Sequence, residues 1–308
     1  MESNFTDRLI KRCRDVKSHV VLELAPLQDK IPAFLSERFE SSGAAVYAYN
    51  KGIIDAVYDI VPAVILPVHL YEVYGVGGIV AMDAAAKYAS AKGMLVIADG
   101  GFGGRREALE GYIHAYLGEG GVKNTAAAEG TFFSDAVTLS PYSDAEGIKN
   151  AAAYCMSAGK GLFINVRNTV SEDAVHFENI IVKSSDEPLY KSAADDSGAF
   201  GRNFIGENGY GVIGMTVYAD QMSDELRKLN RWGIVIVRAE GVHDFSDRAL
   251  YKYFYDDDGE GALILLRDAI LYACDTERSM YGPTEYAEAA REAAISVSKK
   301  IENMLCSI

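Results

Sequence analysis

The sequence predicts a (β/α)8 TIM barrel, and three observations support this fold class. Short apolar, β-branched runs recur along the whole chain, about eight in all. Most are too apolar to leave one face in water, which is typical of parallel strands covered by helices. Helical stretches separate these runs, as the crossover connections of a parallel sheet require. A doubly wound open sheet is the alternative arrangement of the same units.

Gly, Pro, Ser or Asp residues bound the predicted strands. These strands cover residues 19–25, 63–69, 94–99, 136–140, 161–167, 211–216, 233–238 and 262–267. Helices are predicted for residues 223–230 and 247–255. A last helix is predicted after Pro283. Thr284 is expected to cap the N-terminus of this helix, and Glu285 to complement the positive end of its dipole. No linker or composition shift divides the chain, so residues 1–308 are predicted to form a single domain.

Composition narrows the classes of partner and compartment. The formal net charge of −14 argues against nucleic acid and anionic membranes as partners. No apolar run reaches the roughly 20 residues that span a bilayer, and the first residues lack the order of a secretory signal. The cysteines are dispersed, which favours reduced thiols and a cytoplasmic protein without disulfides: Cys13, Cys155, Cys274 and Cys306.

The most informative stretch runs from Leu95 to Arg105 and reads Leu-Val-Ile-Ala-Asp-Gly-Gly-Phe-Gly-Gly-Arg. It resembles a strand end of the orotidine 5′-phosphate decarboxylases, which reads Ile-Ala-Asp-Ala-Lys-Arg-Gly-Asp. The resemblance to the longer bacterial type of this family continues through residues 5–9, 61–64, 71–72, 135–142, 211–216 and 269–273. It implies a (β/α)8 barrel, a homodimer with active sites at the subunit interface, and conversion of orotidine 5′-phosphate to uridine 5′-phosphate and carbon dioxide.

The positions that the resemblance makes catalytic are mostly altered. Asp99 is the only retained member of the family's alternating lysine and aspartate array. Ala25 replaces the aspartate that contacts the substrate ribose, and Ile65 replaces a lysine of the array. Gly101 replaces the lysine that donates the proton, and Gly104 replaces the aspartate that reaches the partner subunit's site.

The phosphate-binding positions are altered as well. Residues 238–245 read Arg-Ala-Glu-Gly-Val-His-Asp-Phe, where the family has Pro-Gly-x-Gly-Ala-Gln-Gly-Gly. Either Arg267 or Asp268 stands at the position of the family's phosphate-binding arginine, depending on a one-residue shift in register. Carboxylates beside a phosphate dianion repel it, so weak binding of phosphomonoesters is expected.

Several further side chains are expected at the carboxyl ends of the strands, where barrel enzymes place their sites. Glu23 and Asp99 could converge there with His69, Glu240 and His243. Such a group could bind a divalent cation or act as a general acid and base pair. Alternatively, Glu23 forms a buried ion pair with Arg167 or Arg238. The glycines at 100–104 either cradle a ligand beside Arg105 and Arg106 or reflect relaxed constraint. The candidate pocket residues are Glu23, His69, Arg105, Ser140, Arg167, Thr216, Glu240, His243 and Arg267.

Together these patterns favour a member of the decarboxylase family that has lost the family reaction and binds a small molecule, a nucleotide or a protein partner. No cofactor is implied, and no metal site is predicted firmly. One alternative is an enzyme with altered, metal-assisted acid and base chemistry. The other is an active decarboxylase with a rearranged site, which must relocate a lysine. Lys51, Lys92 and Lys160 fall at loop or helix positions that suit this role poorly.

Overall fold

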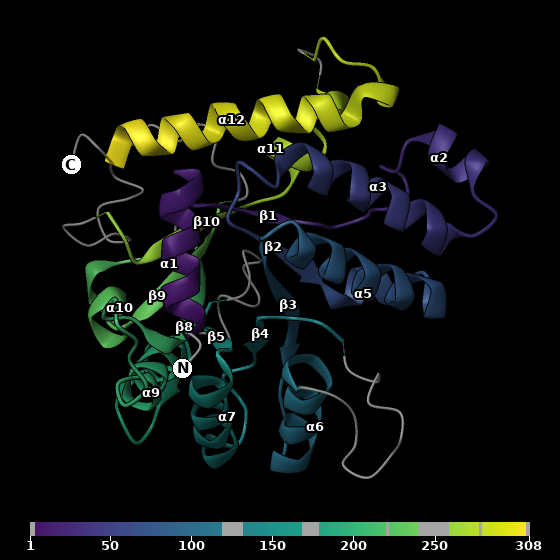
Figure 1. Cartoon of the computed structure of the whole chain (residues 1–308). Helices are drawn as coiled ribbons and strands as arrows, with labels where there is room; N and C mark the ends of the chain where they lie inside the picture. The colour runs from purple at the N-terminus through teal and green to yellow at the C-terminus, as the bar shows by residue number, and fades with distance from the viewer. Residues whose placement is uncertain are drawn as a thin grey trace. The chain divides into compact units, whose positions relative to one another are not determined.

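In the computed structural model, residues 4–118, 132–167, 179–219, 222–239, 259–276 and 279–305 are described. Parallel strands close into a barrel in the order β1-β10-β9-β8-β5-β4-β3-β2 (Figure 1). The predicted barrel and all of its predicted strands are therefore confirmed. The strands are β1 (Val20–Glu23), β2 (Ala63–Pro67), β3 (Leu95–Phe102), β4 (Ala136–Leu139), β5 (Gly161–Asn165), β8 (Gly211–Tyr218), β9 (Gly233–Arg238) and β10 (Ala262–Leu266).

Helices alternate with these strands along the chain. Ser223 caps one of them by accepting from the backbone N–H of Leu226, as expected for the predicted helix at 223–230. The helices are α1 (Phe5–Val16), α2 (Ala33–Arg38), α3 (Ser42–Val57), α4 (Val68–Glu72), α5 (Gly75–Ala91), α6 (Arg106–Leu117), α7 (Ala145–Ala158), α9 (Leu189–Gly201), α10 (Asp224–Leu229), α11 (Asp268–Leu271) and α12 (Tyr286–Leu305).

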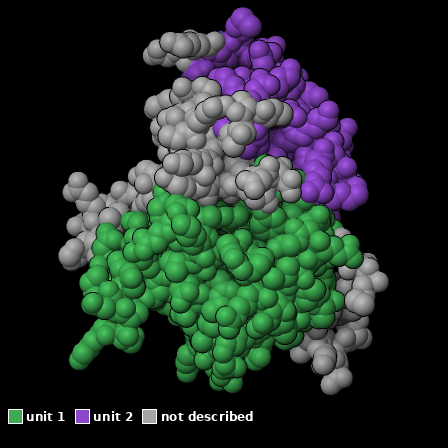
Figure 2. All heavy atoms as spheres, turned by 90° about the vertical axis from the view of Figure 1, so that its left-hand side faces the viewer, with its two compact units in different colours: residues 1–10, 101–264 green, residues 11–100, 265–308 purple. Residues whose placement is uncertain are grey.

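The chain forms two compact units (Figure 2). Unit 1 comprises Met1–Ile10 and Gly101–Ile264, and unit 2 comprises Lys11–Gly100 and Leu265–Ile308. Within unit 1, β4, β5, β8 and β9 pair in parallel, so that Asn165 lies beside Thr216. Within unit 2, β1, β2 and β3 pair in parallel, so that Glu23 lies beside Ile65.

Aromatic rings fill the interior of unit 1 below the strand ends. Phe163 of β5 lies against Gly214 of β8, where an added Cβ would approach the ring to 2.6 Å. Phe5 meets Phe163 edge to face, with ring centroids 5.9 Å apart. Asn165 and Thr216 follow two residues further along the same strands, on the same face. This aromatic layer therefore supports a polar layer nearer the carboxyl ends of the strands.

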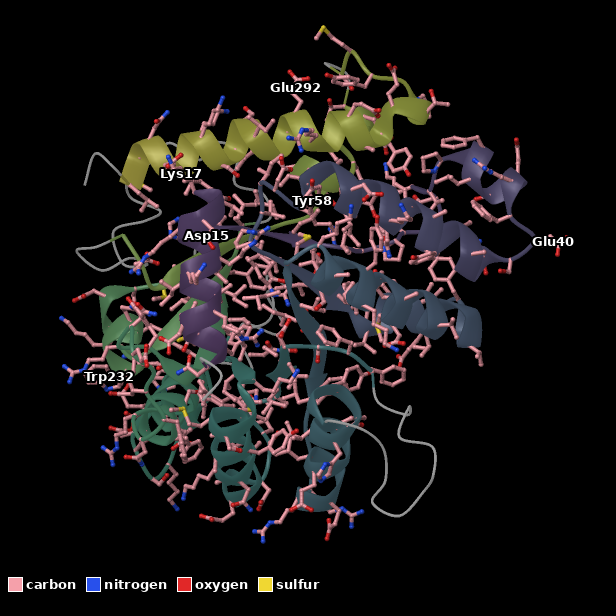
Figure 3. The ribbon with its side chains drawn as sticks, viewed as in Figure 1. Asp15, Lys17, Glu40, Tyr58, Trp232 and Glu292 are labelled. Carbon is pink, nitrogen blue, oxygen red and sulfur yellow. The ribbon has the colours of Figure 1, made fainter. Side chains whose placement is uncertain are left out.

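Local details differ from the expectations at several points. Thr284 does not cap the last helix, because it lies inside a 3-10 turn (Pro283–Glu285) whose Glu285 side chain accepts from the N–H of Gly282. A hairpin of β6 (Ile181–Val182) and β7 (Glu187–Pro188) was not predicted. Residues 247–255 lie outside the described residues. Charged side chains such as Glu40 and Glu292 point into solvent (Figure 3), and no described helix is long and apolar enough to cross a membrane.

Candidate binding site at the strand ends

The retained aspartate of the family array is buried. Asp99 lies in β3 beside Pro67 of β2 and is 8% exposed. Ile65, at the expected lysine position of β2, is 1% exposed and lies beside Glu23, the last residue of β1. Glu23 itself is buried. The part of unit 2 formed by β1, β2 and β3 thus contains two buried carboxylates, those of Glu23 and Asp99, and the apolar side chain of Ile65.

Arg267 is the ionic partner of Glu23. Its Nη1 atom lies 3.7 Å from Oε2 of Glu23. Its Nε and Nη2 atoms lie 2.7 and 3.4 Å from the carboxylate oxygens of Asp268. Glu23 therefore forms an ion pair with Arg267, which was not among the partners expected from the sequence. The reason is topological, because β1 and β10 are neighbours in the barrel and Arg267 directly follows β10.

Two further arginines lie at the carboxyl ends of strands of unit 1, as the sequence predicts. The Arg167 guanidinium lies 4.2 Å from the ring centroid of Tyr190, and its backbone N–H donates to the carbonyl of Thr216. Arg238 is the last residue of β9 and is buried.

Tyrosine hydroxyls hold the segment that follows β1, a feature that sequence reasoning missed. Each donates to a backbone carbonyl, and we call the set the tyrosine clamp. Burial raises the pKa of all three hydroxyls, which keeps them protonated as donors. The clamp fixes the chain at Ala25, one of the positions expected from the sequence to be altered. The pairs are Tyr71 with Leu24 (2.8 Å), Tyr74 with Pro26 (2.5 Å) and Tyr272 with Ala25.

Gly101 adopts a backbone conformation that few other residues tolerate. Its φ is +54°, in the left-handed region that favours glycine. Its backbone N–H donates to Oγ1 of Thr138 over 2.9 Å. A Cβ added at this position would lie 3.3 Å from Nδ2 of Asn165, which is closer than most such contacts. Gly101, which the sequence resemblance places at the family's lysine position, therefore combines the absence of a side chain with a backbone geometry that disfavours one.

Asn165 and Thr216 form a buried neutral pair beside Gly101. The Thr216 hydroxyl donates to Oδ1 of Asn165 over 2.7 Å, and the two residues are 1% and 5% exposed. Thr216 was predicted at this site, whereas Asn165 and Thr138 were not. The available signal was an asparagine that ends an otherwise apolar strand, Gly-Leu-Phe-Ile-Asn.

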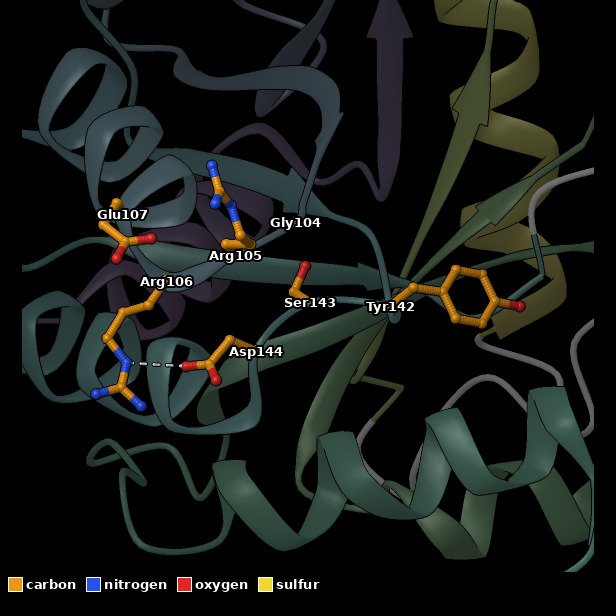
Figure 4. Close-up of a pocket in the computed structure, with 7 residues that line it drawn as sticks. All are labelled: Gly104, Arg105, Arg106, Glu107, Tyr142, Ser143 and Asp144. Atoms are coloured by element: carbon orange, nitrogen blue, oxygen red, sulfur yellow. Dashed lines mark hydrogen bonds and ion pairs between the residues drawn. The ribbon is translucent and has the colours of Figure 1, made fainter.

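The glycine-rich loop opens onto a surface depression of about 640 Å³ that includes Gly104, Arg105 and Tyr142 (Figure 4). Arg105 is exposed there, as the expected cradle requires. The Nε atom of Arg106 lies 3.1 Å from the Asp144 carboxylate, which it holds at a lowered pKa. The positive charge of Arg106 is thus already offset. Ser140, beside this loop, accepts from the N–H of Tyr142.

The expected convergence of carboxylates and imidazoles is not found in the described part of the chain. His69 lies on α4 and is exposed. Glu240 and His243 lie outside the described residues. Among the residues that the structure describes, no group of three or more His, Cys, Asp or Glu side chains could hold a metal ion.

Comparison with known proteins agrees with the fold and with the sequence resemblance. No family model matches the chain. The orotidine 5′-phosphate decarboxylase of Caldicellulosiruptor saccharolyticus is 29% identical over 310 residues, covering 95% of this chain and 99% of that protein. The enzyme of the same name from Clostridium acetobutylicum is 27% identical, covering 94% and 96%.

Solved structures show the same architecture. The OMP decarboxylase of Leishmania donovani superposes with a TM-score of 0.71 at 18% identity, covering 99% of this chain and all of that one. The Plasmodium berghei orotidine 5′-monophosphate decarboxylase gives 0.69 at 16% identity, covering 97% and 100%. Over nearly its whole length the chain is thus similar in sequence to orotidine 5′-phosphate decarboxylases, and it shares the barrel fold of the solved structures.

Proposed function

We propose that this homologue does not decarboxylate orotidine 5′-phosphate and instead uses its barrel to bind a ligand or a partner. The main support for the proposal is the backbone conformation of Gly101 and its close approach to Asn165. A lysine there would have to adopt a φ of +54°. Its Cβ would lie 3.3 Å from Nδ2 of Asn165, so the carboxamide would have to move. A proton-donating ammonium group at this position would therefore require a strained backbone and a shift of the Asn165 side chain.

The other altered positions act in the same direction. Loss of one preorganised charged group typically lowers a rate by about 10² to 10³, and such losses are not simply additive. Ile65 and Ala25 are buried apolar residues where the family has a lysine and an aspartate. At Gly104 the φ of +110° again favours glycine over a side chain.

Phosphate binding at Arg267 is also unfavourable. The guanidinium lies between the Glu23 and Asp268 carboxylates, so its charge is already balanced. A phosphate dianion would have to compete with both carboxylates at short range. We therefore expect the phosphate group to add little to the affinity of this barrel for uridine 5′-phosphate.

The lysines considered for a rearranged site are engaged elsewhere. Lys51 and Lys92 both pair with Asp55, at 2.6 and 2.8 Å. Lys160 donates to the carbonyl of Ser134, just before β5 begins and so at the opposite end of the strand from the site. None of the three supplies a cation at the carboxyl end of a strand.

A spectrophotometric assay of orotidine 5′-phosphate conversion tests the proposal directly. The Caldicellulosiruptor saccharolyticus relative serves as the positive control under the same conditions. The expected turnover of this chain is at least about 10⁴-fold below that of the control, given more than one lost charged group. Formation of uridine 5′-phosphate at a rate within a hundredfold of the control would overturn the proposal.

The same proposal includes a cytoplasmic, single-domain homodimer. Support for a dimer comes from three exposed valines at and just before the start of α5, which we call the valine face: Val73, Val76 and Val80, at 71, 82 and 63% exposed. Groups of exposed apolar side chains are typical of interfaces. The cytoplasm is favoured because Cys13 and Cys155 are buried free thiols.

A further inference from the structure

A groove of about 190 Å³ lies between α6 and α7, and all of its lining residues belong to these two helices. The helices follow consecutive strands and lie side by side within unit 1 (Figure 1). The floor of the groove is apolar, because Ile113 of α6 and Ala151 of α7 are each 5% exposed. Gly147 lies one turn before Ala151 and adds no side chain, so the groove stays open at that end.

Tyr154 forms a wall of this groove. Its hydroxyl donates to the carbonyl of Leu117 over 2.9 Å, which fixes the orientation of the ring. An apolar cavity of about 150 Å³ that is lined by aliphatic and aromatic side chains holds one molecule of benzene. A groove of about 190 Å³ therefore has room for a single aromatic ring with a short substituent.

Glu110 brings a negative charge to the rim of the groove. It lies three residues before Ile113 on α6, so both side chains are on the same face of that helix. Glu110 is exposed and forms no ion pair within the part of the chain that the structure describes. Arg106, one turn earlier, is held 3.1 Å from the Asp144 carboxylate instead. The groove thus combines an apolar floor with a carboxylate that is available to a ligand.

We propose that the groove between α6 and α7 binds a small aromatic amine, with its ring on the apolar floor and its ammonium group on the Glu110 carboxylate. Burial of the ring removes apolar surface from water. The carboxylate selects a positive charge, and the side-chain oxygen of Asn150 on α7 can accept a further N–H. This site is built on the outer helices and does not depend on the proposed loss of decarboxylation.

Three probes separate the contribution of the ring from that of the charge. Benzylamine carries a ring and an ammonium group, benzyl alcohol replaces the ammonium group by a hydroxyl, and methylamine lacks the ring. In calorimetric titration, the wild type should bind benzylamine about fivefold more tightly than benzyl alcohol, as expected for a solvent-exposed ion pair. Methylamine should give no measurable binding. Glu110→Gln should weaken benzylamine binding by about the same factor and leave the affinity for benzyl alcohol unchanged.

Two further variants serve as controls. Glu107→Gln makes the same change in the first turn of α6, outside the groove, and should leave the affinity for benzylamine unchanged. Ala151→Val adds two methyl groups to the floor and should weaken benzylamine and benzyl alcohol alike, with thermal melting to verify its fold. The inference is overturned if benzylamine does not bind the wild type, or if Glu110→Gln and Glu107→Gln change its affinity equally. Neither result bears on decarboxylation, which is measured by turnover.

Discussion

The carboxamide nitrogen of Asn165 lies 3.3 Å from the point where a Cβ on Gly101 would stand. The two residues therefore depend on each other: the missing side chain leaves space that the amide occupies, and the amide in turn opposes any larger residue. The Gly101 N–H bond to Thr138 adds a third constraint, since it holds the backbone in its left-handed turn. At the scale of single residues, the altered site is a repacked arrangement and not a set of simple deletions.

Restoring the lysine alone is expected to fail. Gly101→Lys places a side chain at a φ of +54° and against Asn165, so it should lower the free energy of unfolding by about 1–3 kcal/mol. Decarboxylation should stay at the background rate. Gly111→Ala is the matched control, because its Cβ would meet nothing within 4 Å in α6; this variant should gain about 0.5–1 kcal/mol. Denaturant unfolding measures both, and a stable, active Gly101→Lys variant would contradict the expectation.

The sequence predicts this residue-level picture only in part. The loss of the lysine at Gly101 is visible in the sequence, because glycine offers no ammonium group. The contact with Asn165 is not visible, since it joins strands that are separated by a third strand. The partner of Glu23 was missed for a related reason: several arginines follow strands, and only the closure of β1 against β10 selects Arg267.

The tyrosine clamp shows how neighbouring elements fix the chain after β1. Tyr71 belongs to α4 and Tyr74 follows it, whereas Tyr272 follows α11. The Tyr272 hydroxyl donates to Ala25 and also accepts from the N–H of Leu27 over 3.3 Å. This segment has no regular secondary structure of its own until α2. Side-chain bonds therefore replace the backbone ladder that would otherwise hold it.

Removal of one hydroxyl tests the clamp. Tyr272→Phe leaves the Ala25 carbonyl and the Leu27 N–H without this partner, and it should destabilise the fold by about 1–3 kcal/mol. In Tyr281→Phe the lost hydroxyl bonds only to the exposed Glu292, so the change should be within about 0.5 kcal/mol. Urea unfolding of the two variants provides the comparison. Equal effects would show that the Tyr272 bond contributes nothing particular.

Barrel strands could be predicted well because their burial is strong and local. Residues 234–237 of β9 and all of β10 are continuously apolar, and each run directly follows a glycine, Gly233 or Gly261. Short elements could not be predicted in the same way. The β6–β7 hairpin has two-residue strands that carry no periodic pattern, and its turn depends on Asp186 at a φ of +57°. Thr284 looked like a cap, but the Pro283–Glu285 turn moved the helix start beyond it.

Across the whole molecule, the similarity to the decarboxylases covers nearly the full chain. Sequence identity is 26–29% in the relatives from Caldicellulosiruptor saccharolyticus, Clostridium acetobutylicum and Petrotoga mobilis. The barrel fold is therefore shared along nearly the full length of the chain. The valine face places three exposed apolar side chains at and just before the start of α5. Exposure of such residues to water is unfavourable, and self-association would remove it.

Disruption of the valine face tests the proposed dimer. Val76 is 82% exposed, so Val76→Glu should not disturb the core but should place a charge in the interface. Light scattering after gel filtration should show a dimer for the wild type and a monomer for this variant. Ile181→Glu, at a residue that is 54% exposed on β6, should leave the dimer intact. A monomeric wild type, or a dimeric Val76→Glu variant, would contradict the proposed interface.

The contact between Gly101 and Asn165 also makes substitutions at the two positions depend on each other. A Cβ at position 101 would lie 3.3 Å from the Asn165 amide, so a larger residue there is tolerated better once a smaller residue stands at position 165. That change at position 165 removes the acceptor of the Thr216 hydroxyl. The two positions are therefore expected to vary together and seldom singly.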